Sequence, residues 1–308
     1  MFTASPAHPQ TVFDGIDPFL QHLVVAGKAD HTVISSRLDL QQLARFVGKQ
    51  RLATIASADI DAFVVWLERQ QGNGLSSVRR KVATVKKFFQ FLAINGFLTE
   101  DPAAPIPYPP APERETRALT VAESEGMVRA AGSTLWTALV TCLLDCGLKR
   151  DELVALRWTD ASIESTPHPV IQIRHRQSSQ RARHRVLDIT DRFGQALQRL
   201  REERDLGESI FGISPRGVDF IVETVGRRAD VRSHRKVTPQ MLRDRYALNR
   251  MRRLIEIERE LAADPDVRSA RAREHDVILL RELGLSERSA VAARCRALLS
   301  GNETDRGE

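Results

Sequence analysis

The sequence predicts a mainly α-helical protein of two domains, with one small β-hairpin in the second domain. Apolar residues recur at helical spacing through most of the chain. The stretch 170–189 instead alternates apolar and polar residues on both sides of a polar centre, which is typical of two paired strands. A proline-rich stretch without periodicity, 105–117, separates two periodic regions and is expected to be an extended linker. The 308 residues suffice for two domains of ordinary size.

The first domain, 16–104, is expected to be a bundle of four helices joined by short loops, after a tail at 1–15. Ser57 is expected to cap the third helix, and Gly72 and Gly96 to end the third and the fourth. The helical spacing of apolar residues is found in IDPFLQHLVVAG, HTVISSRLDLQQLARFVG, ASADIDAFVVWLERQQG and LSSVRRKVATVKKFFQFLAINGFL.

The second domain, 118–300, is expected to be mostly helical and is followed by a tail at 301–308. Its first helix starts with a capping box that runs from Thr120 to Glu123. The hairpin is expected to pair two runs of apolar residues across a basic tip, namely Val170, Ile171 and Ile173 with Val186, Leu187 and Ile189.

The charge of the chain favours a polyanionic partner. The net charge is +6, and arginine supplies most of the positive charge, so the surface is expected to attract nucleic acid. An acidic membrane surface would also suit, but no apolar run approaches the roughly 18 residues of a spanning helix. The first residues lack the charged-then-apolar order of a signal peptide, and a cytoplasmic protein is therefore expected.

The cysteines predict a reduced protein rather than a disulfide framework. There are three of them, Cys142, Cys146 and Cys295, without a CxxC pair. Cys142 and Cys146 are four residues apart, so they are expected to share one buried helix face. His175 and His184 are interpreted as ordinary polar residues, and no metal or cofactor is expected.

Five segments in a fixed order resemble one family, the tyrosine recombinases (phage integrases, including Xer-type enzymes). The resemblance extends over about residues 16–300. It implies a helical core-binding (SAM-like) domain at 16–104 and a tyrosine-recombinase catalytic-type domain at 118–300. The segments are GLSSVRRKVATVKKFFQFLAINGFLTEDPA, CGLKRDELVALRWTDASIE, the basic hairpin 170–189, VTPQMLRDRYAL and RELGLSERSAVAARCRAL.

The reaction implied by this resemblance needs several groups in one place. A tyrosine attacks a DNA phosphate and becomes covalently linked to it. Two arginines neutralise the charge that develops on the phosphate oxygens. A lysine on the hairpin and histidines move protons to and from the attacking and leaving oxygens.

The first catalytic motif and the hairpin depart from this pattern. The first arginine corresponds to Lys149, and Arg150 follows it. A shift of one residue on a helix turns the side chain by about 100°, away from the phosphate. No lysine lies between Lys149 and Lys236, and Gln177 or Gln180 occupies the place of the hairpin lysine.

The later motifs depart as well. In the motif that the family writes H-x-L-R-H, Gln240 and Asp244 replace the histidines, and Arg243 is kept. An anionic Asp244 would oppose the binding of a phosphate beside it. Leu285 stands where a histidine follows Leu-Gly, and the usual spacing from there places Arg294 at the position of the nucleophilic tyrosine.

Neither tyrosine of the chain is expected to attack DNA. Tyr108 is in the linker, and Tyr246 lies where the family has a core aromatic residue. Strand cleavage by the family's mechanism is therefore expected to be lost. The residues at the positions of the family's catalytic groups, called the catalytic positions below, are Lys149, Arg150, Gln180, Gln240, Arg243, Asp244, Leu285 and Arg294.

DNA contacts are expected from basic residues at three places: the last helix of the first domain, the hairpin and Arg243. For three groups of basic residues an alternative stays open. Arg243 could instead be a buried ion-pair partner of Glu152 or Asp244, the pair Lys149 and Arg150 a solvated helix end, and the hairpin arginines a solvated face. The expected DNA-binding residues are Arg79, Arg80, Lys81, Lys86, Lys87, Arg174, Arg176, Arg181, Arg183, Arg185 and Arg243.

The stretch 249–280 is longer than the connection that the family has at this point. Leu254, Ile257 and Leu261, then Val277, Leu279 and Leu280, give it apolar stripes between arginines. It is expected to be either a dimerisation element or extra packing that covers the former active site.

These observations predict a duplex-DNA-binding protein of the tyrosine recombinase fold that has lost strand cleavage. Its role would be transcriptional, architectural or accessory to recombination, and its partners would be double-stranded DNA and either a second copy or an active recombinase. Two alternatives stay open: a divergent active recombinase in which Tyr246 is recruited, and a protein-interaction module that no longer binds DNA.

Overall fold

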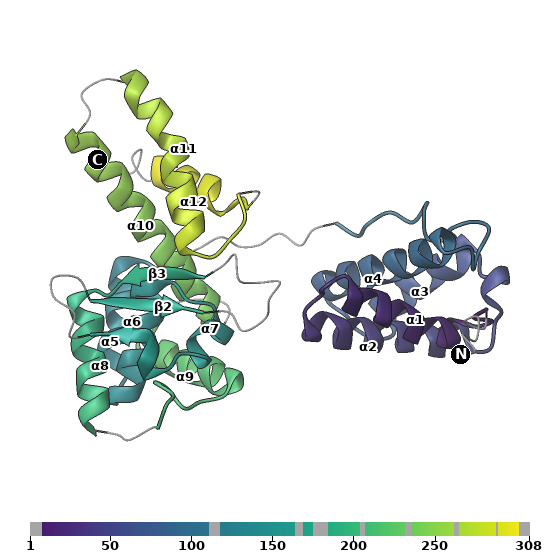
Figure 1. The fold of residues 1–308 in the computed structure, drawn as a ribbon, viewed down its shortest axis with the longest axis horizontal. Helices are drawn as coiled ribbons and strands as arrows, with labels where there is room; N and C mark the ends of the chain where they lie inside the picture. Colours follow the sequence, from purple (N-terminus) through teal and green to yellow (C-terminus); the bar gives the residue numbers. More distant parts are fainter. Residues whose placement is uncertain are drawn as a thin grey trace, which may run out of the picture. The chain divides into compact units, whose positions relative to one another are not determined.

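The computed structural model describes residues 8–110, 118–163, 169–174, 184–203, 207–231, 236–261, 265–287 and 289–301, with only the backbone between 259 and 272. The chain divides into two compact units, Met1–Glu115 and Thr116–Glu308, and this boundary falls inside the predicted linker (Figure 1). Each unit is described separately. The mainly helical fold with a small sheet that the sequence predicts is confirmed.

Unit 1 is the predicted bundle of four helices. Its core is aromatic at the centre, where Phe19, Phe63, Phe88 and Phe89 are almost completely buried. The helices are α1 (Val12–Val25), α2 (Asp30–Val47), α3 (Ser57–Arg69) and α4 (Leu75–Ile94), with a short 3-10 turn, η1 (Leu52–Thr54), between α2 and α3.

Two helix starts in unit 1 differ from the prediction. The side chain of Thr11 accepts a hydrogen bond from Asp14 N and the carboxylate of Asp14 accepts one from Thr11 N, so α1 begins at Val12, within the predicted tail. Ser57 is the first residue of α3 rather than its cap, and its hydroxyl donates to Pro102 O at 3.0 Å. The carboxylate of Asp59 satisfies the first free amide group instead.

The segment after α4 packs on unit 1 as far as the start of the predicted linker. Ala103 and Ile106 are buried in the core of the bundle. The ammonium group of Lys86 donates to the carbonyl groups of Ala103, Ala104 and Ile106. The predicted boundary at residue 104 is therefore too early. Ile106 is buried in the core of the bundle, and Lys86 of α4 holds its carbonyl group.

Unit 2 is a helical body with a three-stranded antiparallel sheet in the order β1-β2-β3. The capping box of Thr120 and Glu123 is confirmed. The helices are α5 (Val121–Ala130), α6 (Thr134–Cys146), α7 (Arg150–Val154), α8 (Asp191–Glu203), α9 (Pro215–Arg228), α10 (Pro239–Leu261), α11 (Pro265–Glu282) and α12 (Val291–Gly301), the strands are β1 (Ala161–Ser162), β2 (Val170–Ile173) and β3 (Arg185–Asp188), and η2 (Trp158–Asp160) is a 3-10 turn.

The predicted hairpin is confirmed by the register of β2 and β3, which pairs Ile171 with Leu187 and Ile173 with Arg185. The strand β1 was not predicted, because two residues are too few to show an alternating pattern. Ile171, Ile173 and Leu187 point into the core against α6, which is buried on nearly every side from Ala138 to Cys146.

The extension 249–280 forms part of α10 and most of α11, which run side by side in opposite directions (Figure 1). Together with α12 they enclose a small core of their own, which contains Met251, Leu279, Leu283 and Cys295. Packing is therefore one role of the extension. Two of its predicted apolar residues, Ile257 and Val277, remain half exposed, at 49% each.

All three cysteines are free and buried, as the sequence predicts. Within the described residues, no helix is long and apolar enough to cross a membrane, and no three His, Cys, Asp or Glu side chains gather as metal ligands would.

Candidate nucleic-acid interface and catalytic positions

The turn between α6 and α7 places the first catalytic position. Gly147 ends α6 in the left-handed conformation, with φ of 57°. The ring of Tyr246, on α10, packs directly against it: a β-carbon at position 147 would lie 2.2 Å from Tyr246 Cδ1. Only glycine fits both the backbone angle and this contact. The close packing fixes α10 against the turn that carries Lys149 and Arg150.

Glu152 and Arg185 form a buried ion pair beneath this turn. Two nitrogens of the guanidinium reach the two carboxylate oxygens, at 3.0 and 2.8 Å. The carboxylate also accepts from Lys149 N at 2.9 Å. Although burial opposes ionisation, the hydrogen bonds and charge of Arg185 hold the pKa of Glu152 below its usual value.

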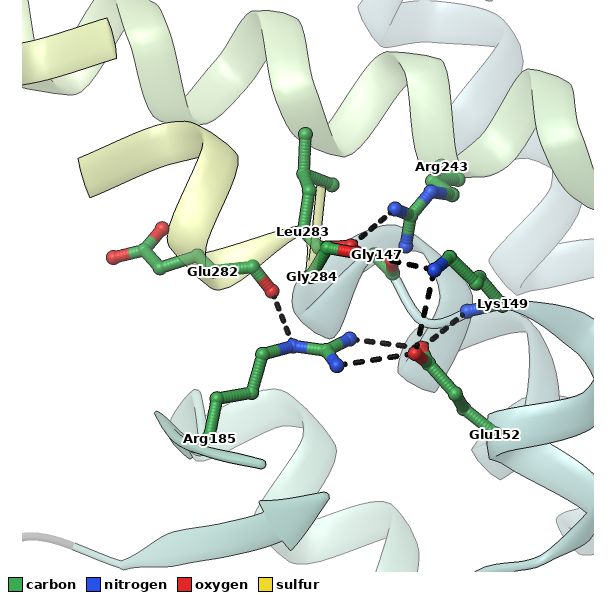
Figure 2. A network of polar contacts seen from close by, with 8 residues as sticks. All are labelled: Gly147, Lys149, Glu152, Arg185, Arg243, Glu282, Leu283 and Gly284. Carbon is green, nitrogen blue, oxygen red and sulfur yellow. Dashed lines mark hydrogen bonds and ion pairs between the residues drawn. The ribbon is translucent and has the colours of Figure 1, made fainter. Parts of the chain in front are cut away.

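Three basic side chains from distant segments donate to three successive carbonyl groups at the end of α11 (Figure 2). The last carbonyl groups of a helix lack partners within the helix and carry partial negative charge, so cations stabilise them. Because these cations come from α7's turn, from β3 and from α10, the end of α11 holds the three together. The pairs are Arg185 Nε with Glu282 O (2.6 Å), Arg243 with Leu283 O, and Lys149 Nζ with Gly284 O (3.2 Å).

Arg243 is the centre of this arrangement. Its guanidinium donates to Gly147 O as well as to Leu283 O, and the residue is only 4% exposed. Burial lowers its pKa to about 10, and the charge of Arg185 acts in the same direction. The structure thus gives Arg243 carbonyl partners in place of the ion-pair partners considered from the sequence, since no ion pair joins it to Glu152 or Asp244 in the described part of the chain.

A hollow of about 460 Å³ adjoins Arg243 and is lined by Lys149, Arg150 and Gln240 among others. Arg150 turns to α9 and pairs with Asp219 at 2.7 Å, so it does not replace Lys149. Lys149 is the extended residue before α7 and Arg150 is its first helical residue, so the expected rotation by one helical step does not apply to this pair.

The remaining catalytic positions form a chain of polar contacts beside the hollow. Gln240 donates to Asp244 Oδ1 at 2.9 Å, and Arg294, on α12, pairs with the same oxygen at 3.1 Å. Leu285 packs against the small core of α10 to α12. The structure therefore brings these positions together, whereas Gln180 and Gln177 lie outside the described residues.

Tyr246 is poorly suited to attack a phosphate. It is 8% exposed, and its hydroxyl donates to Glu282 Oε2 at 3.1 Å. Burial and the negative charge of Glu282 raise its pKa well above the usual value. A phenol that is buried and bonded to a carboxylate does not readily become the phenolate that a nucleophile must be.

Comparison with known proteins supports the fold and the family expected from the sequence. Residues 16–96 match the family described as Phage integrase, N-terminal SAM-like domain. Over 263 residues the chain is 26% identical to the tyrosine recombinase XerC of Xanthomonas campestris pv. campestris (strain B100), covering 80% of this chain and 78% of that protein. Over 80% of its length the chain is thus similar to tyrosine recombinases, which supports the family expected from the sequence.

Solved recombinase structures have the same fold. A lambda integrase dimer bound to a COC' core site superposes with a TM-score of 0.67 and 16% identity, covering 93% of this chain and 77% of that one. A Tn1549 transposon integrase in complex with a circular intermediate DNA superposes with a TM-score of 0.66 and 14% identity, covering 94% of this chain and 99% of that one. XerD of Proteus mirabilis is 28% identical over 156 residues, 48% of this chain and 50% of that protein.

Most of the expected DNA-binding residues on α4 form hydrogen bonds or ion pairs within unit 1. Arg79 donates to Pro109 O, Arg80 pairs with the buried Asp39, and Lys81 donates to Gln42 and Asn73. Lys86 holds the segment after Asp101, as described above. Lys87, by contrast, is exposed and has no hydrogen bond or ion pair with any described residue.

The expected DNA-binding residues of the hairpin differ in their exposure. Arg185 is buried, with 3% of its side chain exposed, and its expected DNA contact is corrected: it is a structural ion-pair partner. Arg174 is 58% exposed and lies 3.3 Å from Asp160. Arg176, Arg181 and Arg183 lie outside the described residues.

The pair of Glu152 and Arg185 and the role of the end of α11 were not predicted. The position of Glu152 in the first turn of α7 is favourable for an acidic residue, but it does not indicate Arg185 as its partner. Nothing in the local sequence indicates that the carbonyl groups of 282–284 bind the cations.

Proposed function

We propose that this protein binds duplex DNA and does not cleave it, acting as a regulatory, architectural or accessory member of its family. DNA binding is supported by the net charge of +6 and by the fold shared with integrases whose structures contain DNA. Its partners would be double-stranded DNA together with a second copy or an active recombinase.

The observation that carries the loss of cleavage is the engagement of Lys149, Arg185 and Arg243 by the carbonyl groups at the end of α11. Catalysis of phosphoryl transfer depends on donors that point at the place where negative charge develops. Here the donors point at the chain's own backbone. The position of the nucleophile holds Arg294, which pairs with Asp244.

Retained DNA binding would rest on exposed cations such as Lys87. A gel-shift assay over fragments of the protein's own genomic region, at rising salt concentrations, tests this proposal. Specific or nonspecific complexes should weaken steeply with salt, because phosphate contacts release counterions. Lys87→Glu should weaken binding more than Lys28→Glu, a matched change of charge on the loop between α1 and α2. Absence of any complex at low salt would instead favour a protein-interaction module.

The absence of cleavage is tested separately with nicked suicide duplexes of any bound site on denaturing gels. No adduct that survives denaturation should form, and Tyr246→Phe should change nothing. An adduct that Tyr246→Phe abolishes would show that the protein is an unorthodox recombinase. Because the gel-shift assay does not depend on chemistry, the two halves of the proposal can fail independently.

A further inference from the structure

An arginine-lined cavity of about 490 Å³ lies in unit 2, among α5, the end of α6, the start of α8 and α10. None of the catalytic positions lines it. The proposed function therefore does not use this cavity. The side chains that matter for its charge are Arg192, Arg245, Arg250, Arg252, Arg253 and Glu256.

Arg245 is buried in the wall of the cavity without a full set of acceptors. The residue is 6% exposed, one terminal nitrogen donates to Leu119 O at 3.2 Å, and its Nε has no hydrogen-bond partner among the described residues. Buried polar groups in proteins are nearly always paired, so this guanidinium lacks part of its usual set of acceptors. Burial and the positive charge of Arg252 lower the pKa of Arg245, as expected for a cation that lacks a counter-charge.

Two of the three acidic side chains that line the cavity already pair with an arginine of the cavity. Arg192 binds both Glu125 and Asp145, which line the cavity with it. Arg250 donates two hydrogen bonds along one edge of its guanidinium, from Nε and a terminal nitrogen, to the two carboxylate oxygens of Glu282.

Three arginines therefore remain against one carboxylate. In the part of the chain that the structure describes, no acidic side chain pairs with Arg245, Arg252 or Arg253. Glu256 is the one lining carboxylate there that no arginine holds. The cavity thus carries an excess of positive charge at a concave site.

We propose that this cavity binds a phosphate-bearing anion. The planar guanidinium group donates two parallel hydrogen bonds to phosphoryl oxygens, which makes arginine the preferred residue for phosphate recognition. A volume of about 490 Å³ exceeds the needs of a single phosphate and is of the size of a small-molecule site, so a di- or polyphosphate fits better. The source of the phosphate is either a small molecule or the backbone of a nucleic acid. The depth of Arg245 favours the small molecule, because duplex phosphates lie on a broad convex surface.

Titration calorimetry of the full chain with pyrophosphate tests the proposal. One saturable site per chain is expected, and Arg252→Glu should weaken binding by about tenfold or more. Arg216→Glu, on the exposed side of α9 and outside the cavity, is the matched control and should bind as the parent does. Arg253→Glu serves as a second variant, because the buried Arg245 is a riskier site for substitution.

No saturable binding of pyrophosphate by the folded protein would overturn the proposal, and so would equal weakening by Arg252→Glu and Arg216→Glu. Citrate that binds as tightly as pyrophosphate would also overturn it, since the site would then bind any polyanion. A duplex-DNA gel shift distinguishes the sources: weakening by Arg252→Glu but not by Arg216→Glu assigns the phosphate to nucleic acid, and unchanged DNA binding assigns it to a small molecule. Pyrophosphate binding needs no DNA binding, so this test is independent of the proposed function.

Discussion

Arg185 and Glu152 meet in a two-point ion pair whose side chains are only 3% and 5% exposed. The same guanidinium donates to Glu282 O at 2.6 Å. One side chain therefore joins β3, α7 and the end of α11. Its described partners are all groups of the protein itself, which leaves this guanidinium buried beside the catalytic position Lys149.

Removing one partner of this pair is expected to be costly. Glu152→Ala leaves the Arg185 guanidinium buried without its counter-charge, which typically costs about 3–5 kcal/mol of unfolding free energy. Urea unfolding of the full chain measures this change. Glu208→Ala provides the control, because its pair with Arg157 is exposed and such pairs contribute about 1 kcal/mol or less. Equal losses in the two variants would contradict a structural role for the buried pair.

The pair also predicts a dependence of stability on pH. Arg185 keeps the pKa of Glu152 below its usual value despite burial. A carboxylate with a depressed folded-state pKa stabilises the protein fully above its unfolded-state value, about 4.3, and this contribution is lost as the pH falls through the folded-state pKa. The difference in urea midpoint between the parent and Glu152→Gln should therefore be constant from pH 7 to about pH 5 and shrink below pH 4. A difference that grows with acidification would refute this linkage.

The contact of Gly147 with Tyr246 predicts a large cost for a single added methyl group. Gly147→Ala meets both an unfavourable left-handed backbone and a contact of 2.2 Å with the tyrosine ring, so a loss of about 3 kcal/mol or more is expected. Gly96→Ala, just after the end of α4, also has a positive φ, 73°, but nothing within 4 Å, and should cost only about 1 kcal/mol. Calorimetric unfolding of both variants separates the clash from the backbone strain.

Helical periodicity and alternation were enough to predict the bundle and the hairpin, because those signals are local. The start of α1 could also have been predicted from the sequence, since Thr11 and Asp14 have the spacing of a capping box. The packing of residues 101–110 could not be predicted, because two apolar residues, Ala103 and Ile106, are too few to form a pattern.

The replaced catalytic residues could be identified from motif order alone, but their contacts could not. Lys149 is 135 residues from Gly284, and Arg185 is 97 residues from Glu282. No local pattern links positions so far apart, and backbone acceptors leave no signature in side-chain identity. Only the tertiary arrangement shows that one helix end holds all three cations.

The buried thiols should be unreactive until the protein unfolds. Burial raises the pKa of Cys295 to about 11 and that of Cys142 well above its usual value, and Cys146 is also buried. At pH 8 a thiol of pKa 11 is ionised in only about one molecule in a thousand. A disulfide-exchange reagent should therefore titrate almost no thiol in the native protein and three per chain in denaturant. Rapid reaction of one thiol in the native state would show that the small core of α10 to α12 opens readily.

Restoring a tyrosine at the position of the nucleophile should not restore cleavage. Arg294→Tyr supplies a phenol on α12, but it also removes the ion-pair partner of Asp244. That carboxylate keeps its bond to Gln240, which lines the hollow together with Lys149 and Arg243. An unpaired negative charge there opposes a phosphate. No covalent adduct is expected on nicked duplexes.

Arg294→Tyr combined with Asp244→His is the matched comparison, because it removes the opposing charge and adds a proton carrier. Lys149 and Arg243 would still be directed at the carbonyl groups of Gly284 and Leu283, so the double variant should remain inactive as well. Denaturing gels measure the adduct in each case. Its appearance in the double variant would mean that DNA displaces the end of α11 and that only two substitutions separate this chain from cleavage.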